Sequence, residues 1–132
     1  PDPVTLRAFI VDDSSRFLAA ARCLLESEGV AIVGTATAAS QARRRIARLR
    51  PDVVLVDVEL DRESGFQLAR RLQRDGGQAA PALVLISIRT EEDYADLVAA
   101  SPAVGFLSKT ALSAASIRNL LQRATEQGPL PQ

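Results

Sequence analysis

The segment Asp52-Val53-Val54-Leu55-Val56-Asp57, near the middle of this 132-residue chain, carries the clearest structural signal. Four apolar residues follow one another, and three of them are β-branched, which predicts a strand that is buried on both faces. Such strands lie near the centre of a parallel sheet that helices cover on both sides. Asp57 follows directly where the strand ends, and in open parallel α/β sheets ligands bind at that edge.

Similar apolar segments lie on both sides of this strand and alternate with amphipathic patterns. Helix-start signals follow them, such as Ser14 or Ser15, Thr90, Ser113, and Ser64 with Gln67 three residues later. Strands are expected at residues 6–11, 31–36, 53–57, 82–87 and 104–107. The order predicts an α/β fold, a doubly wound five-stranded parallel sheet with five helices, of the flavodoxin-like (βα)5 type. We expect one domain over residues 1–132, with a core at about 5–127 and a flexible C-terminal tail at 128–132.

Three finer expectations follow from the same patterns. In the first helix, Leu24 is expected to face the core, with Cys23 beside it as a small packing residue. Residues 74–78 contain two glycines and are expected to form a loop. Thr90 is expected to cap a fourth helix that carries Leu97 along its length.

Composition excludes several classes of function. The chain has 16 basic and 16 acidic residues, so no net charge attracts it to nucleic acid or to an anionic membrane. The absence of histidine excludes histidine-based catalysis and histidine metal ligands, and the lone Cys23 excludes an intrachain disulfide. The chain shows no signal peptide and no apolar run long enough to cross a bilayer, so a cytoplasmic location without membrane contact is expected.

One arginine cluster suggests nucleic-acid binding, but a solvated helix face is the favoured interpretation. It comprises Arg43, Arg44, Arg45, Arg48 and Arg50. Because the net charge is zero, the chain supplies no general attraction for a polyanion. No direct nucleic-acid binding by this domain is therefore expected.

Polar residues stand at the ends of four predicted strands. Asp12 and Asp13 follow the first strand, Asp57 ends the third, Ser87 ends the fourth, and Lys109 follows the fifth. Parallel strands end at the same edge of a sheet, so these side chains are expected to converge. Lys109 is the only lysine among 16 basic residues, which indicates that a compact ammonium group is required there.

Such a cluster has a definite chemistry. Carboxylates held together raise one another's pKa unless a cation lies between them. A set of ligands with oxygen atoms only suits a hard divalent ion, and Mg²⁺ fits best. A carboxylate beside Mg²⁺ can attack phosphorus and form an acyl phosphate, with the metal, an ammonium and a hydroxyl neutralising the transferred group.

Together these segments resemble the receiver domain of response regulators in two-component systems. The resemblance rests on residues 10–14, residues 52–57, Ser87 and residues 105–109, and it extends over residues 5–127. It implies that Asp57 accepts a phosphoryl group from the phosphohistidine of a sensor histidine kinase. It also implies that Mg²⁺ is held by Asp12, Asp13, Asp57 and the backbone carbonyl of Glu59.

The same resemblance assigns the remaining roles. Ser87 and Lys109 would contact the phosphoryl group, and Phe106 would be the rotating aromatic that turns inward and reports phosphorylation to the outer face. The partner that reads this state is expected to be a downstream protein or an effector domain outside this chain, and a homodimer is left open. The domain is not expected to be an enzyme, apart from its own phosphorylation and dephosphorylation.

Some positions depart from the pattern of this family. Asp61 replaces a common proline, and Thr110 replaces the proline that often follows the lysine in a cis peptide, so a trans bend is expected there. The residue after Ser87 is usually small and here is Ile88, while Arg89 is placed to reach Glu59. We hypothesise that Ile88 and the Glu59–Arg89 pair restrict access to Asp57 and shield its acyl phosphate from water.

Two other functions stay open from the sequence. One is an Mg²⁺-dependent aspartyl-phosphate phosphohydrolase, since Glu59 lies two residues beyond Asp57, where such enzymes carry an acid/base. The other is a pseudo-receiver that binds partners without being phosphorylated. Taken singly, each site residue also has a structural explanation, such as a turn, a cap or a surface charge, and only their joint arrangement favours phosphorylation.

Overall fold

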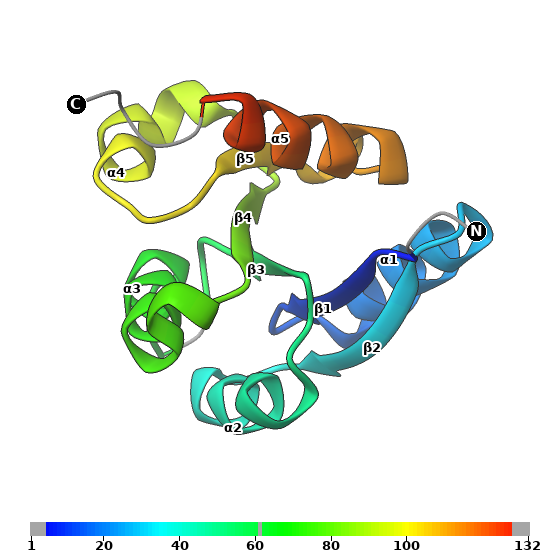
Figure 1. The fold of residues 1–132 in the computed structure, drawn as a ribbon. Coiled ribbons are helices and arrows are strands. Elements are labelled where there is room, and N and C mark those ends of the chain that lie inside the picture. The colour runs from blue at the N-terminus through cyan, green and yellow to red at the C-terminus, as the bar shows by residue number, and fades with distance from the viewer. Residues whose placement is uncertain (1–4, 61, 128–132) are drawn as a thin grey trace.

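The computed structural model describes residues 5–60 and 62–127, and within them five strands form one parallel sheet. The strands are β1 (Arg7–Val11), β2 (Ala31–Ala36), β3 (Val53–Asp57), β4 (Ala82–Ser87) and β5 (Gly105–Ser108). The sheet order is β2-β1-β3-β4-β5, which places β3, whose first four residues are all apolar, at the centre, as predicted. The helices are α1 (Ser15–Ser27), α2 (Ala39–Leu49), α3 (Gly65–Gly76), α4 (Ala95–Ala99) and α5 (Ala114–Gln127) (Figure 1).

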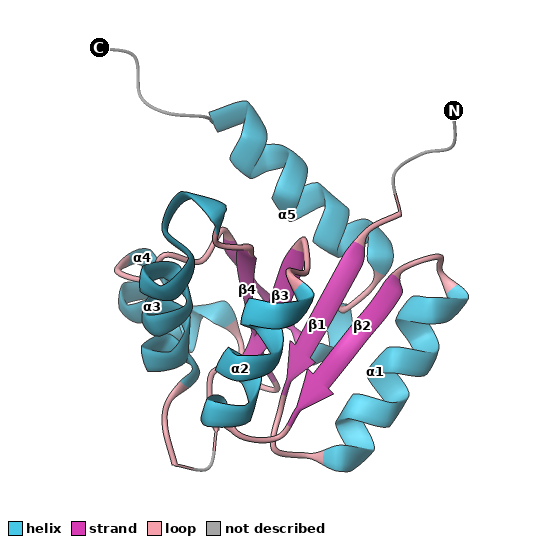
Figure 2. Ribbon diagram, turned by 60° about the horizontal axis from the view of Figure 1, so that its bottom comes forward, coloured by secondary structure: helices cyan, strands magenta, loops and turns pink. Residues whose placement is uncertain are grey.

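Helices cover both faces of the sheet (Figure 2). On one face, alternate strand residues such as Ile10 and Leu55 pack with α1 and α5 around Leu25 and Ile117. On the other face, the intervening residues, Phe9 among them, pack with α2, α3 and the segment around α4. The period-2 alternation along each buried strand therefore supplies both layers of the core.

Local signals set several of the helix boundaries. Ser14 Oγ accepts a hydrogen bond from the Phe17 amide (3.1 Å) at the start of α1. Ser64 and Gln67 form the reciprocal capping box at the start of α3. Gly29, just beyond α1, adopts a left-handed φ of 92° that glycine tolerates without strain.

Two segments differ from their predicted structure. Helix α3 continues through residues 74–76, and a 3₁₀ turn, Gly77–Ala79, replaces the expected loop. Arg43 of α2 binds the Asp75 carboxylate through two hydrogen bonds of 2.9 Å, which anchors this last turn of α3. The predicted fourth helix is instead a 3₁₀ turn, η2 (Glu91–Tyr94), followed by the five-residue α4.

The expected cap of the fourth helix is also absent. Thr90 Oγ1 bonds the Asp93 side chain (3.3 Å) and caps no backbone amide. Leu97 is 51% exposed, so this helix offers little apolar surface to the core, and packing does not extend it.

In α1, the predicted burial of Leu24 and Cys23 is wrong. Leu24 is 41% exposed and Cys23 is exposed, whereas Leu18, Ala21 and Leu25 form the buried stripe. Consecutive helix residues differ by about 100° around the axis, so burial of Leu25 turns its neighbours away from the core.

Two predictions concern residues that the structure does not describe, and another concerns association with a membrane. Asp61 and the predicted tail at 128–132 lie outside the described residues. Among the residues that are described, no helix combines the length and the hydrophobicity needed to cross a bilayer.

Candidate functional site

Three carboxylates meet at the carboxyl edge of the sheet. Asp12 and Asp13 follow β1, and Asp57 ends the neighbouring strand β3, where Val11 pairs with Val56. The three residues each offer a carboxylate oxygen, and these oxygens lie within 4.8 Å of one another. Asp12 is buried and Asp57 is only 6% exposed, whereas Asp13 is exposed. The structure thus brings together the acidic residues that the strand ends predicted to converge.

The Lys109 ammonium joins this cluster from the end of β5. Its Nζ lies 2.6 Å from Asp12 Oδ2 and 3.7 Å from Asp57 Oδ2. It also lies 4.2 Å from the centroid of the Phe17 ring, a distance at which a cation is attracted to the π face. One flexible ammonium therefore contacts two carboxylates and an aromatic ring in a position that is mostly buried.

Backbone amides orient the two buried carboxylates. The Ser14 amide donates to Asp12 Oδ1 (2.9 Å), and the Glu59 amide donates to Asp57 Oδ1 (3.2 Å). Within the described part of the chain, Asp12 Oδ2 is buried and accepts no well-directed hydrogen bond, so the Lys109 ammonium is its only neutralising partner.

The protonation of Asp57 reflects this environment. Burial raises the pKa of Asp57 to about 6, because a charged carboxylate loses hydration there. The hydrogen bond from the Glu59 amide and the charge of Lys109 lower this pKa, while Asp12 and Asp13 raise it. The cluster combines three carboxylates with one ammonium, so Lys109 alone cannot balance its formal negative charge.

These residues fit a hard divalent cation. The donor set has oxygen atoms only, which suits Mg²⁺. Asp12 Oδ2, which accepts no well-directed hydrogen bond in the described chain, is an available ligand atom, and added positive charge would favour the ionised form of Asp57. Glu59, whose carbonyl is the expected fourth ligand, lies in a loop that an antiparallel bridge to Ser64 holds in place.

Ser87 and its neighbours border the site along β4. Ser87 is fully buried, and its Oγ accepts a hydrogen bond from the Arg89 amide (3.0 Å). The Arg89 guanidinium reaches Glu59, with Nε 4.0 Å from Oε2, as the sequence suggested, but both side chains are exposed. Ile88 is 75% exposed, so its side chain is packed against little of the described structure.

Comparison with known protein families identifies the family of this chain. The sequence pattern of the response regulator receiver domain matches residues 8–122, which include every site residue described above. The chain belongs to this family. Its fold, its strand order and the carboxylates at its sheet edge are those of a receiver domain, as the sequence resemblance implied.

Individual similar proteins can be named. The chain is 30% identical over 104 residues to the DNA-binding transcriptional activator EvgA of Escherichia coli K12, covering 79% of this chain and 50% of that protein. It is 33% identical over 92 residues to a protein-glutamate methylesterase/protein-glutamine glutaminase of Halobacterium salinarum, covering 70% of this chain and 26% of that protein. The receiver chain thus spans half or less of the length of these relatives.

Solved structures show the same fold. The signal receiver domain of the putative response regulator NarL from Mycobacterium tuberculosis superposes with a TM-score of 0.74 at 24% identity, over 96% of this chain and 100% of that one. A two-component response regulator of the LuxR family from Aurantimonas sp. SI85-9A1 gives a TM-score of 0.75 at 26% identity, over 94% and 84% of the two chains.

Within the receiver fold, Phe106 occupies a position that the resemblance did not anticipate. It is 7% exposed and already lies inside the protein, whereas phosphorylation was expected to turn it inward. Its ring centroid lies 6.2 Å from that of Tyr94, which lies 5.8 Å from that of Phe66. This aromatic row stabilises the inward position without any phosphoryl group.

The bend after Lys109 is the expected trans one, since every peptide bond in residues 5–60 and 62–127 is trans. A 3₁₀ turn, Lys109–Ala111, follows β5 directly. Ser108 Oγ accepts from the Thr110 amide (3.4 Å) and bonds the Thr110 hydroxyl (3.0 Å). Thr110 thereby supports the turn that carries Lys109.

Sequence reasoning missed Gly65, the first residue of α3. Its amide donates to the Val58 carbonyl (2.9 Å), which draws the start of α3 against the strand that carries Asp57. A Cβ at Gly65 would lie 2.8 Å from Val58 Cα and would also clash with the Asp57 carbonyl. The available signal was a glycine directly after the N-cap Ser64, at a position where a helix has no intrinsic need for one.

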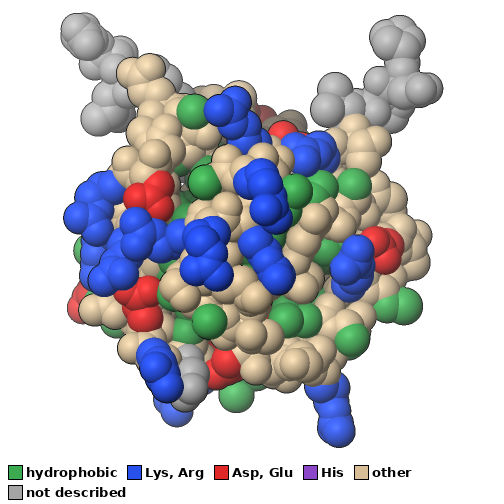
Figure 3. Space-filling model, turned by 90° about the horizontal axis from the view of Figure 1, so that it is seen from below, with side chains coloured by type: hydrophobic (Ala, Val, Ile, Leu, Met, Phe, Trp, Pro, Cys, Tyr) green, Lys and Arg blue, Asp and Glu red, His purple; other side chains and the backbone are tan. Residues whose placement is uncertain are grey.

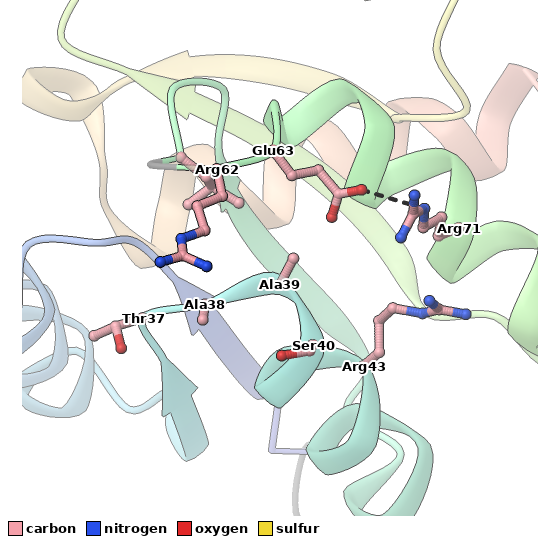
Figure 4. A pocket seen from close by; sticks show the side chains of 9 residues that line it. Thr37, Ala38, Ala39, Ser40, Arg43, Arg62, Glu63 and Arg71 are labelled. Carbon is pink, nitrogen blue, oxygen red and sulfur yellow. Dashed lines mark ion pairs between the residues drawn. The ribbon is translucent and has the colours of Figure 1, made fainter.

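A cavity of about 400 Å³ lies between the loop before α2 and the loop before α3 (Figure 4). Arg43, Arg62 and the ion pair between Glu63 and Arg71 (3.2 Å) line it. None of the three clustered aspartates lines this cavity, so it is distinct from the acidic site.

Proposed function

We propose that Asp57 of this receiver domain accepts a phosphoryl group from the phosphohistidine of a sensor histidine kinase. The observation that carries this proposal is a buried Asp57 carboxylate grouped with Asp12 and Asp13, with the Lys109 ammonium 3.7 Å away. An Asp57 oxygen would attack phosphorus, the P–N bond would break, and its electron pair would remain on the imidazole. The product is an acyl phosphate on Asp57.

The surrounding residues have separate parts in this transfer. The Lys109 ammonium would neutralise charge on the phosphoryl oxygens, since it already lies within reach of Asp57. Asp12, Asp13, Asp57 and the Glu59 backbone carbonyl would hold Mg²⁺, which when bound stabilises the negative charge of the group in transfer. The Glu59 amide holds Asp57 Oδ1 in a fixed orientation.

The state of Asp57 would reach the surface through Ser87. Its hydroxyl accepts a hydrogen bond from the Arg89 amide, and turning to donate to a phosphoryl oxygen would release that amide. The Ile88–Thr90 segment leads directly into η2, so the change would move η2 and α4. Because Phe106 is already buried, the signal in this chain would be a shift of Tyr94 and η2 against Phe106.

The partner that reads this surface would be a downstream protein or an effector domain. The relatives named above carry DNA-binding and methylesterase functions, and this receiver chain matches only part of their length. We further infer that residues 1–132 form one receiver domain, with a core at about 5–127. Its one cysteine has no partner for a disulfide, which suits the reducing cytoplasm.

The test is phosphoryl uptake from a small acyl phosphate in the presence of Mg²⁺, read by intact mass. We expect the chain to gain one phosphoryl group, Asp57→Asn to gain none, and Asp96→Asn, at an exposed carboxylate on α4, to behave like the unmodified chain. Uptake by Asp57→Asn would refute the assignment of Asp57. Absence of uptake by the unmodified chain would instead support a pseudo-receiver.

A second measurement addresses the hydrolase alternative. The chain is incubated with a small phosphomonoester and Mg²⁺, and released phosphate is followed over many equivalents of protein. A receiver releases none beyond background. Sustained turnover that disappears in Glu59→Gln would favour the phosphohydrolase.

A further inference from the structure

The charges of this chain are segregated on its surface even though they sum to zero. Nine of its fifteen arginines lie in residues 43–74, on α2, on α3, directly after α2 or in the loop before α3. Figure 3, which views the molecule from the side where α2 lies in Figure 1, shows basic side chains predominating across this face. By contrast, residues 91–96 hold four acidic residues and no basic one: Glu91, Glu92, Asp93 and Asp96.

The arginine face keeps a positive excess after its own ion pairs are counted. Arg43 binds Asp75 through two hydrogen bonds, and Arg71 pairs with Glu63. Arg44 and Arg48 are exposed on α2 and form no ion pair within the described residues. Their charge is available to a partner.

An apolar groove of about 220 Å³ runs between α2 and α3 on this face. Both arginines and apolar side chains line it, so it combines a small hydrophobic surface with basic groups. Its lining includes Arg43, Arg50, Ile46, Leu72, Pro81 and one acidic residue, Asp75, which is paired with Arg43.

The acidic segment η2–α4 has the complementary character. Its acidic residues are exposed, and Leu97 stands among them with half of its surface in solvent. Ile88, just before this segment, is also exposed, and together they are two of the three exposed large hydrophobic residues in the described chain. In Figures 1 and 2, α3 lies between α2 and α4, so the acidic segment and the groove are separate parts of the surface.

We infer that the η2–α4 segment of one copy docks on the α2–α3 groove of a second copy. Leu97 would enter the apolar groove, and the acidic residues around it would face Arg44, Arg48 and Arg50. The two contact surfaces differ, so the association is heterologous and head-to-tail. A nine-residue segment buries little area, so the contact is weak, concentration-dependent and sensitive to salt. This inference does not depend on phosphorylation of Asp57.

A second copy fits this face better than nucleic acid does. The chain as a whole has no net charge, so no long-range attraction draws it to a polyanion. An apolar groove also has no counterpart on a phosphate backbone. The chain itself carries a segment with the required charge and the required exposed leucine.

Sedimentation of the full chain tests the inference at low and high salt, with three variants. One variant removes acidic charge (Glu91→Gln, Glu92→Gln, Asp96→Asn), and one removes basic charge (Arg44→Gln, Arg48→Gln, Arg50→Gln). The third, Leu97→Ala, keeps every charge. These side chains are all exposed, and circular dichroism and thermal unfolding establish that each variant is folded.

The expected result is an average mass that rises with concentration for the unmodified chain at low salt and returns to the monomer at high salt. Each charge variant alone stays monomeric, and an equal mixture of the two forms a species that stops at the dimer, because each retains one working surface. Leu97→Ala loses association although its charge is unchanged. This pattern is specific to a head-to-tail contact.

Several results would overturn the inference. One is an unmodified chain that stays monomeric at low salt. Another is a mixture of the charge variants that fails to associate, which points to a symmetric contact. A third is unchanged association of Leu97→Ala. A fourth is a chain that stays monomeric but binds an oligonucleotide in a salt-sensitive way. If the arginine variant loses this binding, the face is a nucleic-acid site instead.

Discussion

Lys109 Nζ lies 2.6 Å from Asp12 Oδ2 and 3.7 Å from Asp57 Oδ2, so one ammonium serves two buried carboxylates from neighbouring strands. In the described chain, Asp12 Oδ2 accepts no well-directed hydrogen bond, and the Lys109 ammonium is the cation nearest to it. Lys109 and a divalent ion are therefore expected to compete for the charge of the same carboxylates.

Replacing this lysine should affect stability and metal binding in opposite directions. Lys109→Met leaves Asp12 buried without its counter-charge, and in chelator we expect the free energy of unfolding to fall by about 3 kcal/mol. Mg²⁺ should bind more tightly to the variant because the competing ammonium is gone, while phosphoryl uptake should slow. Urea unfolding with and without Mg²⁺ measures both effects.

Arg89→Met provides the matched control, because it removes a cation whose contact with Glu59 is exposed and 4.0 Å long. Its effect on stability should be at most about 1 kcal/mol. An unchanged or weaker affinity of Lys109→Met for Mg²⁺ would show that the lysine and the metal do not compete.

Asp57 should make the metal-free protein less stable as pH rises. Its folded-state pKa of about 6 lies above the ordinary value, so folding favours the protonated form. Its contribution to stability is fully present below about pH 4 and is lost as pH rises through about 6. A pKa difference of about two corresponds to a loss of about 3 kcal/mol at most.

Asp57→Asn cannot ionise, so in chelator its free energy of unfolding should exceed that of the unmodified chain by a margin that grows from pH 4 to pH 7.5. Urea unfolding at several pH values measures this margin, and Asp96→Asn, at an exposed carboxylate, serves as the control. A margin that does not change with pH would show that the pKa of Asp57 is not raised.

The strands and the acidic site could be predicted because their signals are local. The apolar run before Asp57 marks a buried central strand, and each strand end points to the same edge of a parallel sheet. The caps at Ser14 and Ser64 also depend on neighbouring residues alone.

Other features could not be predicted because they depend on distant contacts. The pattern around Leu97 is helical, yet the helix is short because that side chain finds no core to cover. The inward position of Phe106 depends on Tyr94, which belongs to another element of the fold. The requirement for Gly65 arises from the backbone of Asp57 and Val58, which no pattern within α3 reveals.

Gly65 should be among the positions least tolerant of a side chain. In Gly65→Ala the new Cβ meets backbone atoms, which cannot rotate away, so the start of α3 must move from the strand that carries Asp57. We expect a loss of about 1–3 kcal/mol in stability and slower phosphoryl uptake by the protein that remains folded. Thermal unfolding and uptake from a small acyl phosphate are the measurements.

Gly29→Ala provides a control that separates the two effects. Gly29 has a left-handed φ but open space around it, so alanine there should cost about 1–2 kcal/mol without slowing phosphorylation. Equal uptake rates for Gly65→Ala and Gly29→Ala would show that the contact of Gly65 with the Asp57 backbone does not position the acceptor.

Ile88 should affect the lifetime of the acyl phosphate more than the stability of the fold. Its side chain is 75% exposed, so Ile88→Ala should change the free energy of unfolding by less than about 0.5 kcal/mol. If the side chain restricts the approach of water to Asp57, a barrier change of about 0.5–1 kcal/mol would speed autodephosphorylation about two- to fivefold. The measurement is the decay of the phosphorylated form after the phosphodonor is removed. Leu24→Ala, an exposed leucine on α1, should leave the decay unchanged, and an equal rate for Ile88→Ala would rule out shielding by this residue.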